Sequence, residues 1–279
     1  MNTIKTIFLM GALTVLLVFI GGALGGQSGA FMFFVIAMAM NLFSYFFSDT
    51  VAIKMTRSYP VSEAEQPQLY ASVRKLCRRA DLPMPKLYIT PSYQPNAFAT
   101  GRGPNHAAVA VTEGILQLLT PAELEGVLAH ELAHVKNRDI LIGTIAAGIA
   151  GAISMLANMA HWAMIFGRSD DDDGPGGMIG SLAMIILAPI AATIIQMAIS
   201  RSREYAADAS GAKIAGTSRG LASALLKLEA GAARIPMDVN PAASHMFITN
   251  PLTAEKLLNL FSTHPPIKDR VAKLKEMSF

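Results

Sequence analysis

The sequence predicts a mainly α-helical membrane protein with four transmembrane helices and a separate polar domain of α+β type that contains a small β-sheet. The 279-residue chain is 52 % hydrophobic and only 15 % charged, whereas soluble domains carry about 25 % charged residues. The shortage of charged residues is confined to four long uncharged runs. The rest of the chain has the composition of an ordinary soluble domain, so it predicts a folded unit outside the lipid.

Each uncharged run approaches or exceeds the roughly 20 apolar residues that a helix needs to cross a bilayer. The runs cover residues 6–26, 30–47, 140–167 and 174–200. We interpret the first run as a retained helix and not a signal peptide, because a second apolar run follows at once. The chain then divides into transmembrane helices 1 and 2 (1–48), a polar segment (49–139), transmembrane helices 3 and 4 (140–200) and a second polar segment (201–279). Gly22 and Gly26 have the spacing that lets membrane helices approach closely.

The distribution of basic residues predicts the orientation. Residues 48–139 contain ten Lys and Arg and residues 200–279 contain eleven, whereas the loop at 27–29 has none and the loop at 168–177 has one Arg beside four Asp. Because basic loops stay in the cytoplasm, both polar segments and both termini are expected there.

The net charge and the cysteine content exclude other classes of protein. A net charge of +3 gives no reason to expect nucleic-acid binding. The lone cysteine, Cys77, excludes an intrachain disulfide framework and a cysteine-rich zinc ribbon.

The two polar segments together form one domain of about 170 residues, which is large enough for its own core. Residues 64–80 predict an amphipathic helix and residues 86–90 a short strand. Residues 96–100 and 107–112 flank a Gly-rich turn, which predicts a β-hairpin or two strands at the sheet edge. Thr120 followed by Pro121 predicts the start of another helix.

That helix carries the sequence His130-Glu131-Leu132-Ala133-His134. Positions i and i+4 of a helix lie on one face, so both imidazoles can reach one metal ion. Glu131 lies beside the metal, where it can take a proton from the attacking water and later deliver it to the leaving amine. The pattern predicts metal-assisted hydrolysis of a peptide bond, with His130 and His134 as metal ligands and Glu131 as the base.

A catalytic zinc needs a third protein ligand and one open position. His161 and the acidic residues 170–173 are expected at or beyond the outer face of the membrane, so the ligand should come from another segment. Glu204 and Asp208 follow the fourth apolar run with i, i+4 spacing. Glu204 is our third ligand, and Asp208 is expected to accept a hydrogen bond from the far nitrogen of a ligand histidine. Alternatively, both carboxylates pair with the neighbouring Arg201 and Arg203.

Two other classes of protein use similar ligands. A metal transporter should place an acidic residue or a ligand pair in the middle of the membrane, and the uncharged runs contain none. A scaffold with a structural zinc usually fills all four metal positions, often with cysteines. Metal-dependent cleavage of a peptide would distinguish an enzyme from a transporter or a scaffold.

Five segments resemble the HtpX-type membrane proteases, part of a larger family that includes the CAAX prenyl-protein proteases. They are residues 96–101, 110–116, 130–134, 202–208 and His264-Pro265. The resemblance runs the whole length and implies a zincin-like cytoplasmic domain with a gluzincin site, in which Glu204 binds one Zn2+ per chain. It also implies a bacterial or archaeal cell (inner) membrane, and protein substrates, especially damaged or misassembled membrane proteins. The resemblance does not indicate an oligomeric state.

The resemblance extends to residues outside the ligand set. It implies that two strands face the substrate, whose backbone could add to a sheet edge; an ordinary hairpin is the alternative. Their residues are Asn96, Ala97, Phe98, Ala99, Ala108, Val109, Ala110 and Val111. It also places His264 and Arg270 near the active site, where either cation could stabilise the oxyanion. The alternative for Arg270 is an anchor for a surface helix.

Overall fold

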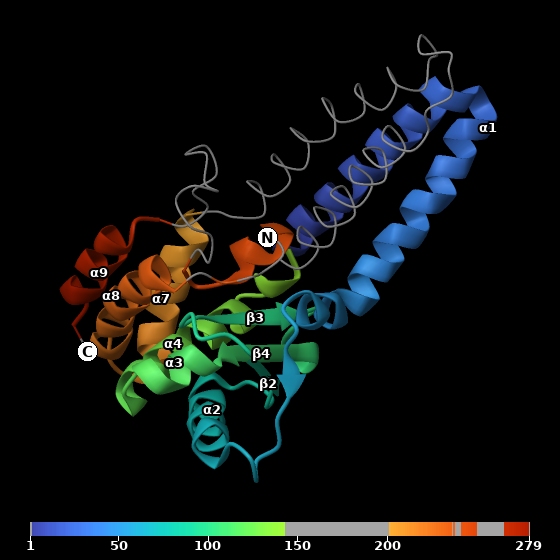
Figure 1. Ribbon diagram of the computed structural model, residues 1–279. Coiled ribbons are helices and arrows are strands. Elements are labelled where there is room, and N and C mark those ends of the chain that lie inside the picture. Colours follow the sequence, from blue (N-terminus) through green and yellow to red (C-terminus); the bar gives the residue numbers. More distant parts are fainter. Residues whose placement is uncertain (1, 143–200, 236, 238–240, 250–264, 279) are drawn as a thin grey trace.

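A long helical hairpin projects from a body of helices packed around a small sheet (Figure 1). The computed structural model describes residues 2–142, 201–235, 237, 241–249 and 265–278. The third and fourth apolar runs, apart from residues 140–142, lie outside the described residues, so the four-span arrangement stays a prediction. Among the described residues, Gly25–Phe47 is the one helix long and apolar enough to cross a membrane.

The hairpin is helix α1 (Asn2–Met55), which reverses direction at Gly25 and Gly26. Gly26 has φ +59° and ψ −145°, a conformation that a residue with a Cβ rarely adopts. The expected packing role of Gly26 is therefore wrong, because this glycine makes the turn and has open space where a Cβ would lie. The two arms approach closely at Gly21 and Gly29, since a Cβ on either would collide with the carbonyl oxygen of the other.

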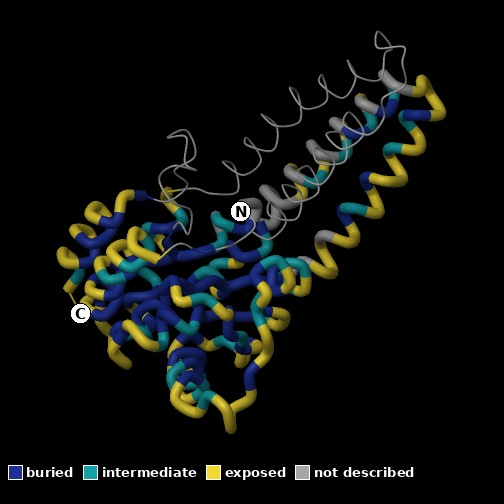
Figure 2. Tube along the Cα trace, viewed as in Figure 1, coloured by how far each residue is buried: buried dark blue, intermediate teal, exposed yellow. Residues whose placement is uncertain are grey.

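A polar contact also joins the two arms of α1. The Nδ2 of Asn41 donates to Thr14 Oγ1 at 2.9 Å and lies 3.3 Å from the carbonyl oxygen of Met10. Such a bond between helices is a common stabilising contact in an apolar environment. Large apolar side chains such as Phe31 and Phe43 point outward from the second arm, which is largely exposed along its length (Figure 2). The helix continues to Met55, beyond the boundary expected at residue 48.

The sheet has four strands in the order β1-β2-β4-β3. The strands are β1 (Tyr59–Pro60), β2 (Lys86–Thr90), β3 (Ala97–Gly101) and β4 (Ala107–Thr112). Strand β4 pairs parallel with β2 and antiparallel with β3. The β3–β4 hairpin is thus confirmed, with the short helix η1 (Pro104–His106) in its turn. Strand β4 is an inner strand, and β3 has no second partner strand among the described residues.

Helices from both polar segments pack together on this sheet. They are α2 (Pro67–Ala80), α3 (Glu113–Leu118), α4 (Pro121–Lys136), α7 (Arg201–Ala215), α8 (Arg219–Arg234), η2 (Pro241–Met246) and α9 (Ile267–Glu276). The expected amphipathic helix is confirmed as α2, whose residues Leu69, Val73, Leu76 and Cys77 are all buried. Helix α4 lies at the centre, in contact with α2, α7, α8 and β3, and is buried over much of its length.

The start of α4 is fixed by a capping box. Thr120 and Glu123 exchange side-chain to backbone hydrogen bonds, which satisfies donors that a helix start leaves free. Glu123 also accepts hydrogen bonds from Ser223 (2.6 Å) and Lys227 (2.7 Å) on α8. Burial raises the pKa of Glu123, but the bonds from Lys227, Ser223 and Thr120 outweigh burial and hold it at about 2. One carboxylate therefore caps α4 and fastens it to α8.

Candidate metal centre

The first and last residues of the His-Glu-x-x-His segment are one turn apart, which brings two imidazoles together on one face of α4. The Nε2 atoms of His130 and His134 lie 3.2 Å apart, and His130 is almost fully buried. Two nitrogens bound tetrahedrally to zinc, each at 2.0–2.1 Å, would be separated by about 3.3 Å. The spacing of the two donor atoms therefore suits one metal ion between them.

Helix α7 supplies the third donor. Glu204 Oε1 lies 3.5 Å from His134 Nε2, and Glu204 Oε2 lies 3.9 Å from His130 Nε2. The three donor atoms all fall within 4.8 Å of one another. This close approach depends on Gly211 further along α7, because a Cβ there would lie 2.9 Å from the backbone of His130. Two histidines and a glutamate are the donor set of a known class of catalytic zinc site, so the residues fit the metal.

Behind His130 lies a buried ion pair. His130 Nδ1 is 2.9 Å from Asp208 Oδ1. Asp208 in turn accepts two hydrogen bonds from Arg270 on α9, at 2.8 Å from Nε and 2.7 Å from Nη2. Although burial raises the pKa of Asp208, the bonds from Arg270 and His130 lower it to about 2. Asp208 therefore stays ionised and can accept a hydrogen bond from the Nδ1–H of His130.

Arg270 lies next to the donor set, as the resemblance implied, and its guanidinium is engaged by Asp208. Its side chain is fully buried and turns inward from α9 onto Asp208. Its Nη1 lies 3.6 Å from Glu204 Oε2 and 3.4 Å from the carbonyl oxygen of Ile248. The guanidinium is thus held behind the donor set by carboxylates from α7, and α9 is anchored through the interior of the domain.

Behind His134 lies Asp139, which sequence reasoning missed. Asp139 Oδ2 is 3.3 Å from His134 Nδ1, and the carboxylate is almost fully buried. Asp139 lies beyond the end of α4 and five residues from its partner, so no i, i+4 spacing predicts the contact. Its position directly before the third apolar run was the one available signal, since an acidic residue there needs a partner.

Glu131 lies beside the donor atoms and does not join them. Its carboxyl group is 3 % exposed. Burial and the nearby Glu204 raise the pKa of Glu131 to about 7, against the opposing effects of His134, Arg270 and the backbone amide of Ala99. A carboxyl group that changes protonation near neutral pH can both accept and return a proton, which is what a general base needs.

The two strands expected to face the substrate have different roles. Strand β4 is flanked by β2 and β3, so residues 108–111 cannot pair with an added peptide. This part of the expectation is wrong, because the order of strands in the sheet depends on a parallel pairing that the local sequence does not specify. Strand β3 is the edge, and its residue Ala99 contacts Glu131 through its backbone amide.

Part of the β3 edge is already occupied by the chain itself. The amide of Ile248 donates to the carbonyl oxygen of Ala97 at 3.0 Å. The Asn96 side chain donates to the carbonyl of Thr249 at 2.8 Å and accepts from its amide at 3.3 Å. Phe247 packs edge-on against Phe98, with ring centroids 5.1 Å apart. The amino end of β3 is therefore closed, and Ala99, further along the strand, is the residue in contact with Glu131.

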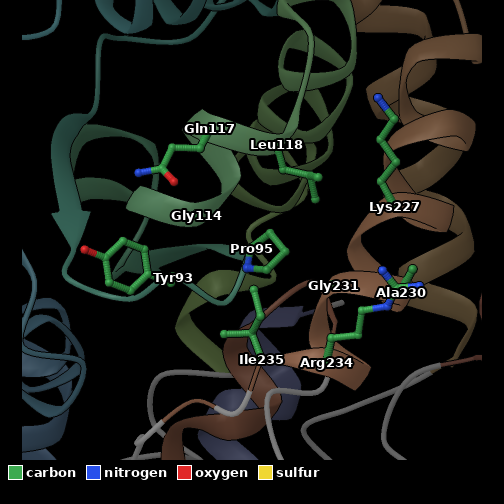
Figure 3. A pocket seen from close by; sticks show the side chains of 10 residues that line it. All are labelled: Tyr93, Pro95, Gly114, Gln117, Leu118, Lys227, Ala230, Gly231, Arg234 and Ile235. Atoms are coloured by element: carbon green, nitrogen blue, oxygen red, sulfur yellow. The ribbon is translucent and has the colours of Figure 1, made fainter.

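His264, expected near the active site, lies outside the described residues. A separate groove of about 490 Å³ lies between α3 and the end of α8, where Leu118, Ile235 and Arg234 are among the residues that line it (Figure 3). None of its lining residues is a donor of the metal centre, so the groove has no part in the site.

A helix that presents two histidines and a base to one metal position, completed by a glutamate from a second helix, defines a metalloprotease. This chain is therefore an enzyme of that class. It belongs to Peptidase family M48, whose profile matches residues 63–278. The resemblance found in the sequence motifs is confirmed, and the family makes the protein a membrane-associated metalloprotease.

Relatives with the printed name "Protease HtpX homolog" match along the entire chain. The protein from Pelotomaculum thermopropionicum is 64 % identical, with 100 % of both chains covered. That from Thermodesulfovibrio yellowstonii is 57 % identical, covering 100 % of this chain and 99 % of the relative. The crystal structure of S. mikatae Ste24p has a similar fold, with a TM-score of 0.52 at 18 % identity. The match covers 98 % of this chain and 65 % of that chain.

Proposed function

We propose that this chain is a zinc-dependent endopeptidase that cleaves proteins at the cytoplasmic face of the cell membrane. The observation that carries the proposal is the convergence of His130, His134 and Glu204, whose donor atoms lie within 4.8 Å of one another. Zinc bound there would lower the pKa of a water ligand and polarise the scissile carbonyl. Glu131 takes the proton from the attacking water and returns it to the leaving amine.

The surrounding residues orient these groups. Asp208 accepts a hydrogen bond from the Nδ1–H of His130, which keeps the proton on Nδ1 and leaves Nε2 free to bind the metal. Arg270 holds Asp208 by two hydrogen bonds and acts through it as a positioning residue. Because the guanidinium is occupied in this way, Arg270 is a weaker candidate for contact with the oxyanion than the sequence suggested.

The substrate binds as an extended strand beside β3. An added peptide gains affinity from backbone hydrogen bonds, which all substrates can form, and this suits broad specificity. Ile248 and Thr249 close the edge at Asn96 and Ala97. The substrate backbone therefore pairs with the stretch from Ala99 to Gly101, next to Glu131.

The site lies at the inner membrane surface, with residues 49–139 and 201–279 forming one catalytic domain and residues 140–200 spanning the bilayer twice. His134 lies six residues before Ile140, where the third apolar run begins, and the chain between them turns back after α4 ends at Lys136. Glu204 lies four residues after Ser200, where the fourth run ends. Both ligand-bearing helices are thus close to the expected lipid boundary, and the distribution of basic residues favours the cytoplasmic side.

Single-cysteine labelling tests this orientation. Cys77 is buried and is first replaced by Ala, and a cysteine is then introduced at Asp171 or at Arg78, which is exposed on α2. An impermeant thiol reagent added to intact cells should label the cysteine at Asp171, whereas the one at Arg78 should react only after lysis. Labelling at Arg78 in intact cells would mean that the topology is inverted.

We also propose a role in removing misfolded or damaged membrane proteins. An edge strand pairs with extended backbone, and folded proteins rarely present such segments. The purified enzyme should therefore cleave an unfolded test protein much faster than its folded form under the same conditions. Equal rates for the two forms would contradict selection of misfolded substrates while leaving the protease activity established.

A further inference from the structure

The end of α4 folds back onto its own last ligand. Arg138 has φ +58°, a left-handed conformation that costs a residue with a Cβ about 1 kcal/mol. This conformation lets the amide of Asp139 donate to the carbonyl oxygen of His134 at 2.9 Å, while the amide of Arg138 donates to Val135 at 3.1 Å. The same turn brings the Asp139 carboxylate to 3.3 Å from His134 Nδ1. The backbone and side chain of Asp139 therefore both contact the ligand residue.

Each of the two ligand histidines contacts a buried carboxylate through its Nδ1 atom. His130 contacts Asp208, which is held by Arg270 on α9. His134 contacts Asp139, and the partly buried Arg203 on α7 lies close enough for the charges of Asp139 and Glu204 both to act on it. Each imidazole thus has a buried carboxylate on its Nδ1 side and an arginine near that carboxylate.

We propose that Asp139 is a positioning residue for the metal ligand His134. Its carboxylate accepts a hydrogen bond from the Nδ1–H, which fixes the tautomer with the Nε2 lone pair directed at the metal position between His130 and Glu204, and holds the ring in the orientation that binds metal. The proposal rests on the proposed metal site. Removal of such a partner of a ligand histidine weakens metal binding by about 10- to 100-fold.

The position of Asp139 in the chain gives this contact a second consequence. Ile140 and Ile142 follow directly and are buried, and they begin the third apolar run. Arg203 follows just as closely after the fourth run. The His134–Asp139 contact therefore joins a metal ligand to the point at which the chain leaves the catalytic domain for the predicted membrane helices.

Metal titration of the full chain in detergent tests the proposal. Zinc affinity is measured by competition with a chromophoric chelator, and the visible spectrum is recorded after loading with cobalt(II). Asp139→Ala should weaken zinc binding by about 10- to 100-fold and shift the cobalt spectrum. Asp139→Asn retains an acceptor oxygen and should recover most of the affinity. The matched control is Glu125→Gln on α4, which removes a partly exposed carboxylate paired at 2.8 Å with Lys75 of α2 and should change neither readout.

Three results would overturn the proposal. They are wild-type zinc affinity in Asp139→Ala, an unchanged cobalt spectrum in that variant, and an affinity in Asp139→Asn as low as in the Ala variant. If the Ala variant does not fold, as judged by circular dichroism, the comparison of Asp139→Asn with wild type decides, with a small loss of affinity expected. A wild-type chain that binds no zinc would instead contradict the proposed function.

Discussion

Glu131→Gln should leave the metal centre loaded and the fold intact, and should lower the rate of peptide cleavage by about 10²- to 10⁴-fold. This corresponds to roughly 3–5 kcal/mol of transition-state stabilisation. The reason is geometric, because the donor set consists of His130, His134 and Glu204 and does not include Glu131. An amide has nearly the same shape as the carboxyl group but cannot accept the proton of the attacking water.

The measurement is the initial rate of cleavage together with the zinc content of the same preparation. Glu125→Gln, an amide substitution at a partly exposed position of the same helix, should retain the wild-type rate. Near-normal turnover in a fully zinc-loaded Glu131→Gln protein would remove the base from the mechanism. A loss of zinc in that variant would show that Glu131 is itself a ligand.

Glu204→Ala should abolish cleavage and weaken zinc binding more than any change to a residue behind the ligands. It removes one of three donors, and Glu204 is the one donor that comes from a helix other than α4. Without it, the two histidines alone hold the ion, and a catalytic zinc site normally requires three protein ligands. Zinc affinity and cleavage rate are measured on the same purified chain.

The matched comparison is Asp208→Asn, which keeps an acceptor oxygen for His130 Nδ1 and should weaken zinc binding much less than Glu204→Ala does. An asparagine is better suited here than an alanine, because its amide oxygen can still accept a hydrogen bond from the fully buried Arg270. Asp208→Ala would leave that guanidinium without its main partner, at a cost of about 3–5 kcal/mol of folding free energy, and this would obscure the effect on metal binding. The assignment of Glu204 fails if Asp208→Asn releases zinc and Glu204→Ala does not.

The sequence specified the parts of the site that follow from helical periodicity. The i, i+4 spacings of His130 with His134 and of Glu204 with Asp208 place each pair on one helical face, and the structure brings three of these four residues together as donors. The capped start of α4 at Thr120 and the buried face of α2 follow from equally local patterns.

Other features depend on contacts that local patterns do not contain. Asp139 reaches His134 through the left-handed turn at Arg138, and a non-glycine residue gives little sign of such a turn. Arg270 points inward because α9 packs on a helix 62 residues earlier in the chain. Strand β4 is an inner strand because it pairs in parallel with β2, although β3 lies between these two strands in the sequence. Each of these three features depends on contacts that form only when the domain is folded.

The central claim is that a metal ion held by His130, His134 and Glu204 is required for peptide-bond cleavage. The most direct measurement uses the full chain purified in detergent, with zinc content and cleavage of an unfolded test protein recorded before chelation, after chelation and after addition of zinc. We expect one zinc per chain, loss of cleavage when it is removed, and recovery when zinc is restored. Cleavage that continues at the same rate in the metal-free chain would contradict the account.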